Sequence, residues 1–307
     1  MIQKRQYKHC KIFNTPNSIL MKSLTQEKEI FLEKKARDVR ETIIKMLVEA
    51  GSGHTAGPLG MTDVFVALYF HILNHNPEDP DWADRDRLVL SNGHIVPVRY
   101  ATMAHAGYFP VEECMTLRKF GSRLQGHPER TRLPGMETTS GPLGSGLSQA
   151  SGMAYAAKMD RKKFRVYCLM SDGEQQAGNI WEAAMFAGRN KLGNLVGIMD
   201  RNNIQINGMT EEVMPLEPIK QKYESFGWHV LEVDGHNMEA IIDACDEARA
   251  IYEKPTMVIA HTIPGKGIPD IEFDYEWHGK PPKPEQAEEF ITQVRTMCGK
   301  VSCGDKE

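Results

Sequence analysis

The feature that most limits the possible folds is a repeated alternation of short apolar runs with helical segments in the second half of the chain. An apolar run at 164–170 precedes a helical segment at 180–191 and a second apolar run at 195–199. The same order recurs at 228–233, 238–252 and 256–261. Strands that alternate with helices form a mainly parallel sheet covered on both faces. The sequence therefore predicts an α/β fold, a three-layer sandwich with a mainly parallel sheet.

The first half of the chain predicts more helix than strand. Apolar residues recur at helical spacing from 25 to 50, and Gly51 ends that pattern. A buried helix is expected at 61–73, a strand at 87–90, a helix at 147–159 and a final helix after the Pro-rich segment 281–286. Residues 121–146 hold many glycines and prolines, which predicts little regular structure there.

Composition excludes several classes of protein. The 307 residues are 41% hydrophobic and 25% charged, as in soluble globular proteins, and the length allows two domains or one large one. A net charge of −4 argues against a nucleic-acid partner. The sequence contains no run of 18 apolar residues, so a membrane span is not expected. The six cysteines include no CxxC pair, which indicates free thiols in a reducing cytoplasm.

The N-terminal residues 1–26 differ from the rest in charge. They contain no Asp or Glu but carry Lys4, Arg5, Lys8, Lys11 and Lys22, without the apolar core of a secretory signal. We expect a basic extension at 1–26 and a single domain at 27–307.

Polar residues follow two of the predicted strands where each strand ends. Asp172 and Gly173 follow the run at 164–170, and Asn202 follows the run at 195–199. Parallel strands bring their carboxyl ends to one edge of a sheet, where ligands bind. Carboxylate, amide and carbonyl oxygens suit Mg²⁺, and a glycine lets the backbone approach a diphosphate. Taken singly, the same residues could be a helix cap and a turn.

Four histidines lie in turn-rich segments beside glycine or proline: His54, His94, His127 and His278. Functional side chains concentrate in such loops, although a lone loop histidine is usually only solvated. Imidazole suits proton transfer because its usual pKa is near neutral pH.

Several motifs in order resemble those of transketolases. SDGE (171–174) with NNIQING (202–208) is similar to the diphosphate-binding signature of thiamine diphosphate enzymes. The segments closest to transketolase are SGHTAGPLGMTD (52–63), HNPEDPDWADRDRLVLSNGH (75–94), GHPE (126–129), ETTSGPLGSGLSQASGMA (137–154), FGWHVLEVDGHN (226–237) and WHGKPP (277–282). The resemblance covers roughly residues 40–285 and implies the thiamine diphosphate-binding fold.

The resemblance assigns roles to individual residues. Asp172, Asn202 and the backbone carbonyl of Ile204 would hold Mg²⁺. The diphosphate would be surrounded by His94, Gly173, Asn202 and His278. Leu143, in a loop that includes Gly141 and Gly144, would face the aromatic part of thiamine diphosphate. The catalytic histidines, which orient the sugar and move protons, would be His54, His127 and His278.

The resemblance also implies a partner. In the family, the glutamate that activates the cofactor and the groups that bind the donor phosphate lie on a pyrimidine-binding domain. Family members carry that domain after the region matched here. We therefore expect a separately encoded C-terminal subunit, self-association into an α2β2 assembly, and transfer of a two-carbon ketol unit between sugar phosphates.

Two departures and three alternatives accompany this interpretation. Ser171 replaces the usual first glycine of the signature, and Ala177 replaces a glutamate that links the two cofactor sites, although Glu182 remains. Another thiamine-dependent ketol or aldehyde transferase, or a non-catalytic cofactor-binding subunit, would carry similar motifs. A nicotinamide site is disfavoured, because Gln149 stands where the dinucleotide fingerprint needs Gly or Ala.

Overall fold

The computed structural model describes residues 24–296. The basic extension predicted for 1–26 lies outside these residues except for its last three, which lead into the first helix. Cys298 and Cys303 also lie outside the described part.

A parallel sheet forms the centre of the described part of the chain. Its strands run in the spatial order β1 (Arg87–Leu90), β2 (Val166–Ser171), β3 (Leu195–Arg201), β7 (Thr256–His261) and β6 (His229–Asp234). Every neighbouring pair in this sheet is parallel. The predicted parallel sheet is therefore confirmed, with all five predicted strands within two residues of their expected positions.

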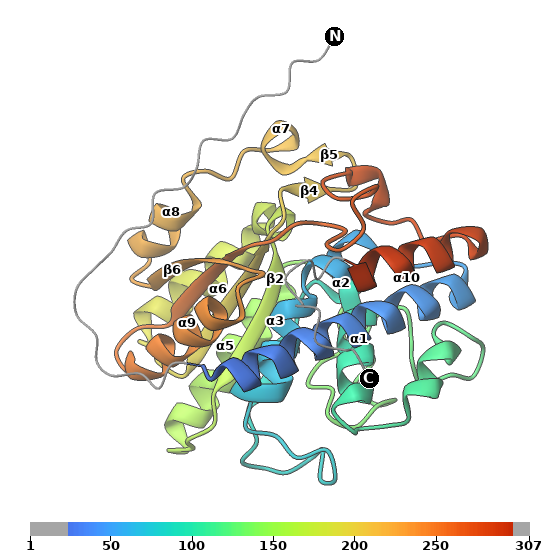
Figure 1. Cartoon of the computed structure of the whole chain (residues 1–307). Helices are drawn as coiled ribbons and strands as arrows, with labels where there is room; N and C mark the ends of the chain where they lie inside the picture. The colour runs from blue at the N-terminus through green and yellow to red at the C-terminus, as the bar shows by residue number, and fades with distance from the viewer. Residues whose placement is uncertain (1–23, 297–307) are drawn as a thin grey trace.

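Helices cover both faces of the sheet, which gives three layers (Figure 1). Alternate residues of each strand enter two separate apolar cores, because side chains along a strand point to opposite faces. In β2, Tyr167 and Leu169 join one core, whereas Cys168 and Met170 join the other. The first core lies under α1, α3, α4, α9 and α10, and the second under α5, α6 and α8.

The first layer is built around α1 (Gln26–Ala50), which packs along α10 (Ala287–Thr296) (Figure 1). Thr25 caps the start of α1, and Gly51 ends it at φ +60°, a conformation that glycine adopts without strain. Around it lie α2 (Ala56–Gly60), α3 (Thr62–Ala67) with a π-helical turn at Leu68–Ile72, α4 (Val96–His105) and α9 (Met238–Ala250). Sequence periodicity missed α2 and α4, because these helices are buried almost all round and show no amphipathic stripe.

The second layer contains α5 (Ser145–Met159), α6 (Gly178–Arg189) and α8 (Ile219–Ser225). A small hairpin of β4 (Ile204–Gln205) and β5 (Gly208–Met209) with α7 (Thr210–Val213) follows β3 and was not predicted. Short 3₁₀ turns at Gly93–Ile95, Val111–Thr116, Gly173–Gln176, Tyr275–Trp277 and Pro284–Gln286 complete the structure.

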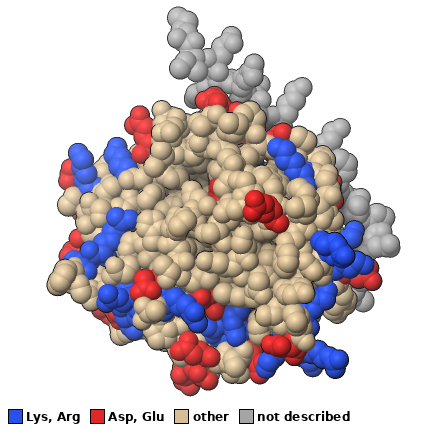
Figure 2. All heavy atoms as spheres, turned by 180° about the vertical axis from the view of Figure 1, so that it is seen from behind, with Lys and Arg blue, Asp and Glu red and all other residues tan. Residues whose placement is uncertain are grey.

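Charged side chains are distributed unevenly over the surface. On one face, Lys and Arg gather toward the edges around a broad centre with few charges (Figure 2). Within residues 24–296, no helix has the length and apolar content needed to cross a membrane.

Candidate active site at the carboxyl ends of the strands

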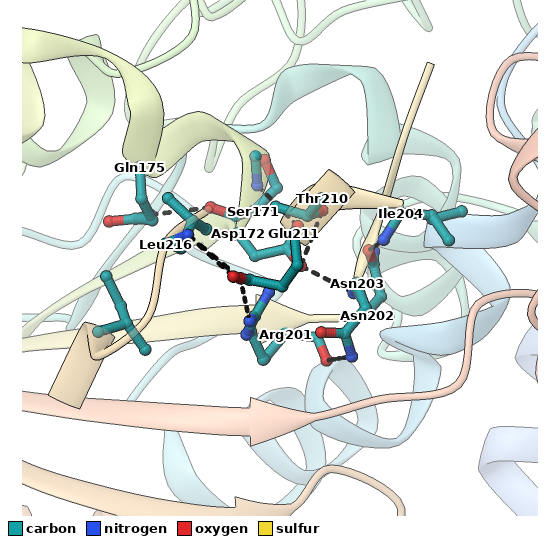
Figure 3. A network of polar contacts seen from close by, with 12 residues as sticks. Ser171, Asp172, Gln175, Arg201, Asn202, Asn203, Ile204, Thr210, Glu211 and Leu216 are labelled. Carbon is teal, nitrogen blue, oxygen red and sulfur yellow. Dashed lines mark hydrogen bonds and ion pairs between the residues drawn. The ribbon is translucent and has the colours of Figure 1, made fainter. Parts of the chain in front are cut away.

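The ends of β2 and β3 lie side by side, as the sequence predicted. Ser171 pairs with Asp200 in the sheet register, so Asp172 follows β2 directly beside the end of β3. The Asp172 side chain is fully buried, and its Oδ2 accepts hydrogen bonds from the Asn203 backbone N–H at 2.7 Å and from Arg201 at 3.1 Å. Figure 3 shows this carboxylate enclosed between the two strand ends.

Arg201 is a buried partner of Asp172 that sequence reasoning missed. Its guanidinium also contacts Glu211 at 2.6 Å and Glu217 at 2.9 Å, so it joins β3 to the segment after the small hairpin (Figure 3). Burial raises the pKa of Asp172, and Arg201 opposes that rise. A charged residue at the end of a buried strand was the available signal for this network.

Asn202 shapes the turn that follows β3. Its Oδ1 accepts from the Ile204 backbone N–H at 3.0 Å, and its Nδ2 donates to Asp200 at 2.9 Å. Asp200 also accepts a hydrogen bond from Thr262, at the end of β7. Burial raises the pKa of Asp200 to about 7. The ends of three neighbouring strands are thus joined beneath the site.

A cavity of about 490 Å³ opens above these strand ends. Its lining comes from the loop before α2, from the loop segments around 94, 127 and 143, from the ends of β2 and β3, and from the segment before α10. The lining residues are His54, Gly57, His94, His127, Gly141, Leu143, Ser171, Gly173, Glu174, Gln176, Asn202, Ile204, Gln205, Ile206 and His278.

Three imidazoles form one cluster in the cavity. The ring centroids of His54 and His94 are 4.9 Å apart, those of His94 and His278 are 5.1 Å apart, and those of His54 and His278 are 5.4 Å apart. Burial lowers the pKa of His54 to about 4, and it also lowers the pKa values of His94 and His278. The imidazoles are therefore neutral at pH 7, and their pKa values lie further from neutral pH than the usual value expected from the sequence.

A neutral imidazole carries one hydrogen-bond donor and one acceptor, so the cluster can bind a polar ligand. The buried Nδ1 of His54 has no hydrogen-bond partner within the described chain. Both side-chain polar atoms of Asn92, close in sequence to His94, are also buried and without a partner there. Buried polar atoms of this kind are normally paired. His54 lines the cavity, which points to a polar ligand there, whereas Asn92 does not line it.

Glu174 ties the loop around Leu143 to the sheet. Its carboxylate accepts hydrogen bonds from the Gly144 backbone N–H at 2.5 Å, from the Ser171 backbone N–H at 3.1 Å and from the Ser91 hydroxyl. Gly144 has φ +87°, and a Cβ there would lie 2.1 Å from Oδ1 of Asn179. The loop conformation therefore requires glycine at this position.

Most predicted site residues converge on this cavity. His54, His94, His127, His278, Gly141, Leu143, Gly173, Asn202 and Ile204 all line it. Asp172 lies beneath the lining, and Gly144 contributes a buried backbone contact instead of cavity surface. His127 makes no ring contact with the other three histidines in this structure and is the most exposed of the four.

The sequence matches the family described as transketolase, thiamine diphosphate binding domain, over residues 33–300. An apulose-4-phosphate transketolase subunit from Phocaeicola vulgatus is 43% identical over 270 residues, which cover 88% of this chain and 96% of that relative. The 6-deoxy-6-sulfo-D-fructose transketolase subunit SqwG of Clostridium sp. (strain MSTE9) is 43% identical over 241 residues, which cover 78% of this chain and 88% of the relative.

The same likeness holds in three dimensions. The crystal structure of transketolase from Campylobacter jejuni superposes with a TM-score of 0.80 at 36% identity, over 87% of this chain and 42% of that chain. This chain thus spans less than half of the solved transketolase, whereas it spans nearly all of the relatives named as subunits. The chain therefore belongs to the transketolase family, and its residues 33–300 match the thiamine diphosphate-binding domain of that family.

Proposed function

We propose that this chain binds the diphosphate end of thiamine diphosphate through Mg²⁺ and, with a pyrimidine-domain subunit, transfers a two-carbon ketol unit from a ketose phosphate to an aldose phosphate. The main observation behind the proposal is the histidine-lined cavity directly above Asp172 and Asn202, at the ends of β2 and β3. Free, buried Cys114, Cys168 and Cys245 support a reducing, cytoplasmic location.

The residues at the strand ends fit a magnesium ion. Asp172 offers a buried carboxylate, Asn202 an amide oxygen and Ile204 a backbone carbonyl, which are the hard oxygen donors that Mg²⁺ prefers. The hydrogen bond from Asn203 to Asp172 holds the two segments together at 2.7 Å. Three protein ligands leave coordination positions for phosphate oxygens.

The cavity beside this donor set fits a diphosphate and an aromatic ring. Gly173 keeps the backbone bare at the end of β2, where a Cβ would lie 3.1 Å from Oε1 of Gln205. His94 and His278 line the same cavity, with ring centroids 5.1 Å apart, and would donate N–H groups to phosphate oxygens. Leu143 and Ile206 are partly exposed and supply apolar surface for the ring system.

When bound, thiamine diphosphate supplies the nucleophilic carbon for breaking and forming the carbon–carbon bond. This chain's histidines do the positioning and proton movement around that centre. His54 is neutral at pH 7 and lines the cavity, so its imidazole can hydrogen-bond to a sugar hydroxyl and receive or return its proton. His278 lines the same wall, whereas His127 lies further out and would contact the distal part of the sugar.

The partner is proposed on two observations. The relatives that this chain matches over nearly their whole length are named as subunits, one of an apulose-4-phosphate transketolase and one of a 6-deoxy-6-sulfo-D-fructose transketolase. Exposed apolar side chains also lie on the outer faces of α5 and α6: Tyr155, Met159, Met185 and Phe186. A partner that covers them, with two copies of each subunit, would complete the site.

The names of these relatives also suggest a substrate class. Both sugars carry a terminal tetrahedral anion, a phosphate in one and a sulfonate in the other. We propose that this chain acts on sugars of the same kind.

Reconstitution tests the proposal. The purified chain is assayed for ketol transfer alone and after mixing with the pyrimidine-domain subunit, with thiamine diphosphate and Mg²⁺ present. We expect turnover only in the mixture. Turnover by the chain alone would contradict the need for a partner. Cofactor binding without turnover in any mixture would identify a non-catalytic cofactor-binding subunit instead.

A further inference from the structure

A second cavity lies at the amino ends of the strands, away from the candidate active site. It opens beside Arg165, which precedes β2, and Asn194, which precedes β3, whereas the candidate active site lies at the carboxyl ends of these strands. Its volume is about 380 Å³. We call it the basic cavity, and the residues that line it are Lys158, Arg161, Lys162, Lys163, Arg165, Lys191, Gly193, Asn194 and Tyr252.

The charge of the basic cavity is one-sided. Six of its nine lining residues are Lys or Arg, and none of these described residues is Asp or Glu. The whole chain, by contrast, has a net charge of −4. A cavity lined by one sign of charge raises the local concentration of ions of the opposite sign. The basic cavity is therefore suited to an anion.

Main-chain carbonyls hold two of these cations in place. Arg165 donates to three carbonyls beside the cavity, at 2.8 to 3.3 Å. Lys158 donates to two carbonyls at the end of α6, at 2.8 and 3.0 Å. A carbonyl carries no net charge, so these bonds fix the side chains without neutralising them.

Most of the remaining cations have no polar partner. The side chains of Arg161, Lys163 and Lys191 make no hydrogen bond or ion pair within residues 24–296. Lys162 pairs with Asp84 at 3.0 Å, but the two side chains are 47% and 58% exposed. Ion pairs in such exposed positions contribute little. The basic cavity therefore keeps most of its positive charge available to a ligand.

Two of the unpaired cations lie where helices usually carry glycine. Arg161 lies just after α5 with φ +53°, and Lys191 lies just after α6 with φ +49°. In both helices the next backbone N–H donates to a carbonyl of the last turn, at 2.8 Å for α5 and 3.2 Å for α6, which closes a Schellman motif. Glycine adopts this left-handed conformation without strain, whereas other residues do so at a cost. The backbone alone would thus favour glycine at both positions.

Tyr252 adds an aromatic surface to the same wall. Its side chain is 80% exposed and lines the cavity. A Cβ on Gly193 would lie 2.2 Å from the Tyr252 carbonyl oxygen, so the two segments pack closely only because residue 193 is glycine. An exposed aromatic ring beside cations can stack a nucleobase whose phosphates the cations bind.

A neighbouring cavity of about 540 Å³ shows the opposite balance of charge. It shares four cations with the basic cavity, but Asp84 and Asp86 also line it. Asp86 accepts a hydrogen bond from the Arg165 backbone N–H at 2.8 Å, so its carboxylate stays on that side. The neighbouring cavity is therefore less suited to an anion than the basic cavity.

We propose that the basic cavity is a binding site for a small polyphosphate anion, with Tyr252 in position to stack the base when the polyphosphate belongs to a nucleotide. Arginine and lysine are the side chains that bind phosphate oxygens most strongly, and a chain of several phosphates can meet several cations at once. A volume of about 380 Å³ fits a small molecule. The site is independent of the proposed function, because it lies at the other end of the sheet.

Calorimetric titration of the full chain with tripolyphosphate tests the site. EDTA replaces Mg²⁺ in the buffer, so metal-dependent binding at the candidate active site is removed. We expect saturable binding that weakens as salt is added. The double variant Arg161→Gly with Lys191→Gly should lower the affinity by at least about tenfold. Because glycine suits both backbone conformations, this variant should unfold at the same or a higher temperature, so a folding defect cannot explain the loss.

Two controls locate the binding. Lys34→Gln with Lys45→Gln removes the same number of charges from α1 and should bind like the wild type. Asp172→Asn, at the candidate active site, should also bind like the wild type. Unchanged affinity in the double glycine variant would show that these cations only complement the helix ends, and it would overturn the proposal. An equal loss in the α1 control would overturn it as well, since the effect would then be one of net charge.

Comparison of tripolyphosphate with ATP identifies the source of the polyphosphate. Tighter binding of ATP, with that preference lost in Tyr252→Leu, identifies a nucleotide. Equal affinities in the wild type and in Tyr252→Leu identify an inorganic polyphosphate. Tighter binding of a single-stranded oligonucleotide than of ATP would contradict a small-molecule site.

Discussion

At the scale of single residues, the feature with the largest consequences is a carboxylate buried beside an arginine. Asp172 is fully buried, and its pKa is raised by that burial, yet it accepts hydrogen bonds from two backbone N–H groups and from Arg201. Burying a charge is costly unless it is paired, and Arg201 supplies that pairing from the neighbouring strand. Asp172 therefore joins the ends of β2 and β3 and also offers the proposed oxygen ligand for Mg²⁺.

Asp172→Asn tests the metal assignment. The amide keeps the shape but loses the charge, so we expect the Mg²⁺-dependent affinity for thiamine diphosphate to fall by about 100-fold or more. Isothermal titration calorimetry of the chain measures it. Asp84→Asn, which removes an exposed ion pair with Lys162, should leave the affinity unchanged. An unaltered affinity in Asp172→Asn would refute the assignment.

The lowered pKa of His54 predicts how the stability of the fold depends on pH. Its pKa falls from 6.5 to about 4 on folding, so the unfolded chain binds a proton more readily. Neutral His54 therefore contributes up to about 3 kcal/mol to the free energy of unfolding. This contribution is fully present above pH 6.5 and is lost as the pH falls toward 4.

Urea unfolding at pH 7 and pH 5 checks this dependence. We expect the loss of unfolding free energy between the two pH values to be smaller in His54→Gln than in the wild type. His261→Gln, at an exposed position beside Glu232, should follow the wild type. His94 and His278 titrate in the same direction, so part of the loss remains in His54→Gln.

At the scale of elements, Glu174 connects three segments that are far apart in sequence. It bonds to the end of β1 through Ser91, to the loop before α5 through Gly144 and to the end of β2 through Ser171. The loop carries Leu143 into the cavity, and its position depends on Glu174 and on the Gly146 backbone N–H, which donates to the Ser91 hydroxyl at 3.0 Å.

Glu174→Ala should destabilise the chain by about 2 kcal/mol, because two backbone N–H groups lose their buried acceptor. It should also weaken cofactor binding, since the loop is no longer fixed. Chemical denaturation and calorimetry measure the two effects. Glu182→Gln, on the exposed side of α6, is the control and should change the stability of the chain by less than about 0.5 kcal/mol. Unchanged stability in Glu174→Ala would show that the loop is held by other contacts.

At the scale of the whole molecule, the outer faces of α5 and α6 are unusually apolar for exposed helices. Met185 is 56% exposed and Phe186 43%, and the Phe186 ring packs against Tyr155 at 5.6 Å. Aromatic side chains at the centre of an interface often dominate its binding energy.

Phe186→Asp should therefore weaken association with the pyrimidine-domain subunit by about 30-fold, equivalent to roughly 2 kcal/mol, while the chain alone keeps its unfolding midpoint. Analytical ultracentrifugation of the mixture measures association. Tyr252→Asp alters an aromatic residue that is 80% exposed in the segment between α9 and β7, and it should associate normally. Normal association by Phe186→Asp would place the interface elsewhere.

The sequence by itself determined the parallel sheet, the positions of its strands to within two residues and, through the resemblance to transketolases, the identity of most cavity-lining residues. Strand–helix alternation and glycine-flanked histidines are local patterns, so they can be read without knowing which segments meet. The same holds for Asp172 and Asn202, because the carboxyl ends of adjacent parallel strands share an edge.

Only the tertiary structure decided which groups touch. The Arg201 bond to Asp172, the Glu174 connection between three segments, and the lowered histidine pKa values all arise from contacts between distant residues or from burial. The physical reason is that hydrogen bonding and desolvation depend on the full three-dimensional surroundings of a group. Periodicity and turn residues, by contrast, can be recognised from the order of residues along the chain.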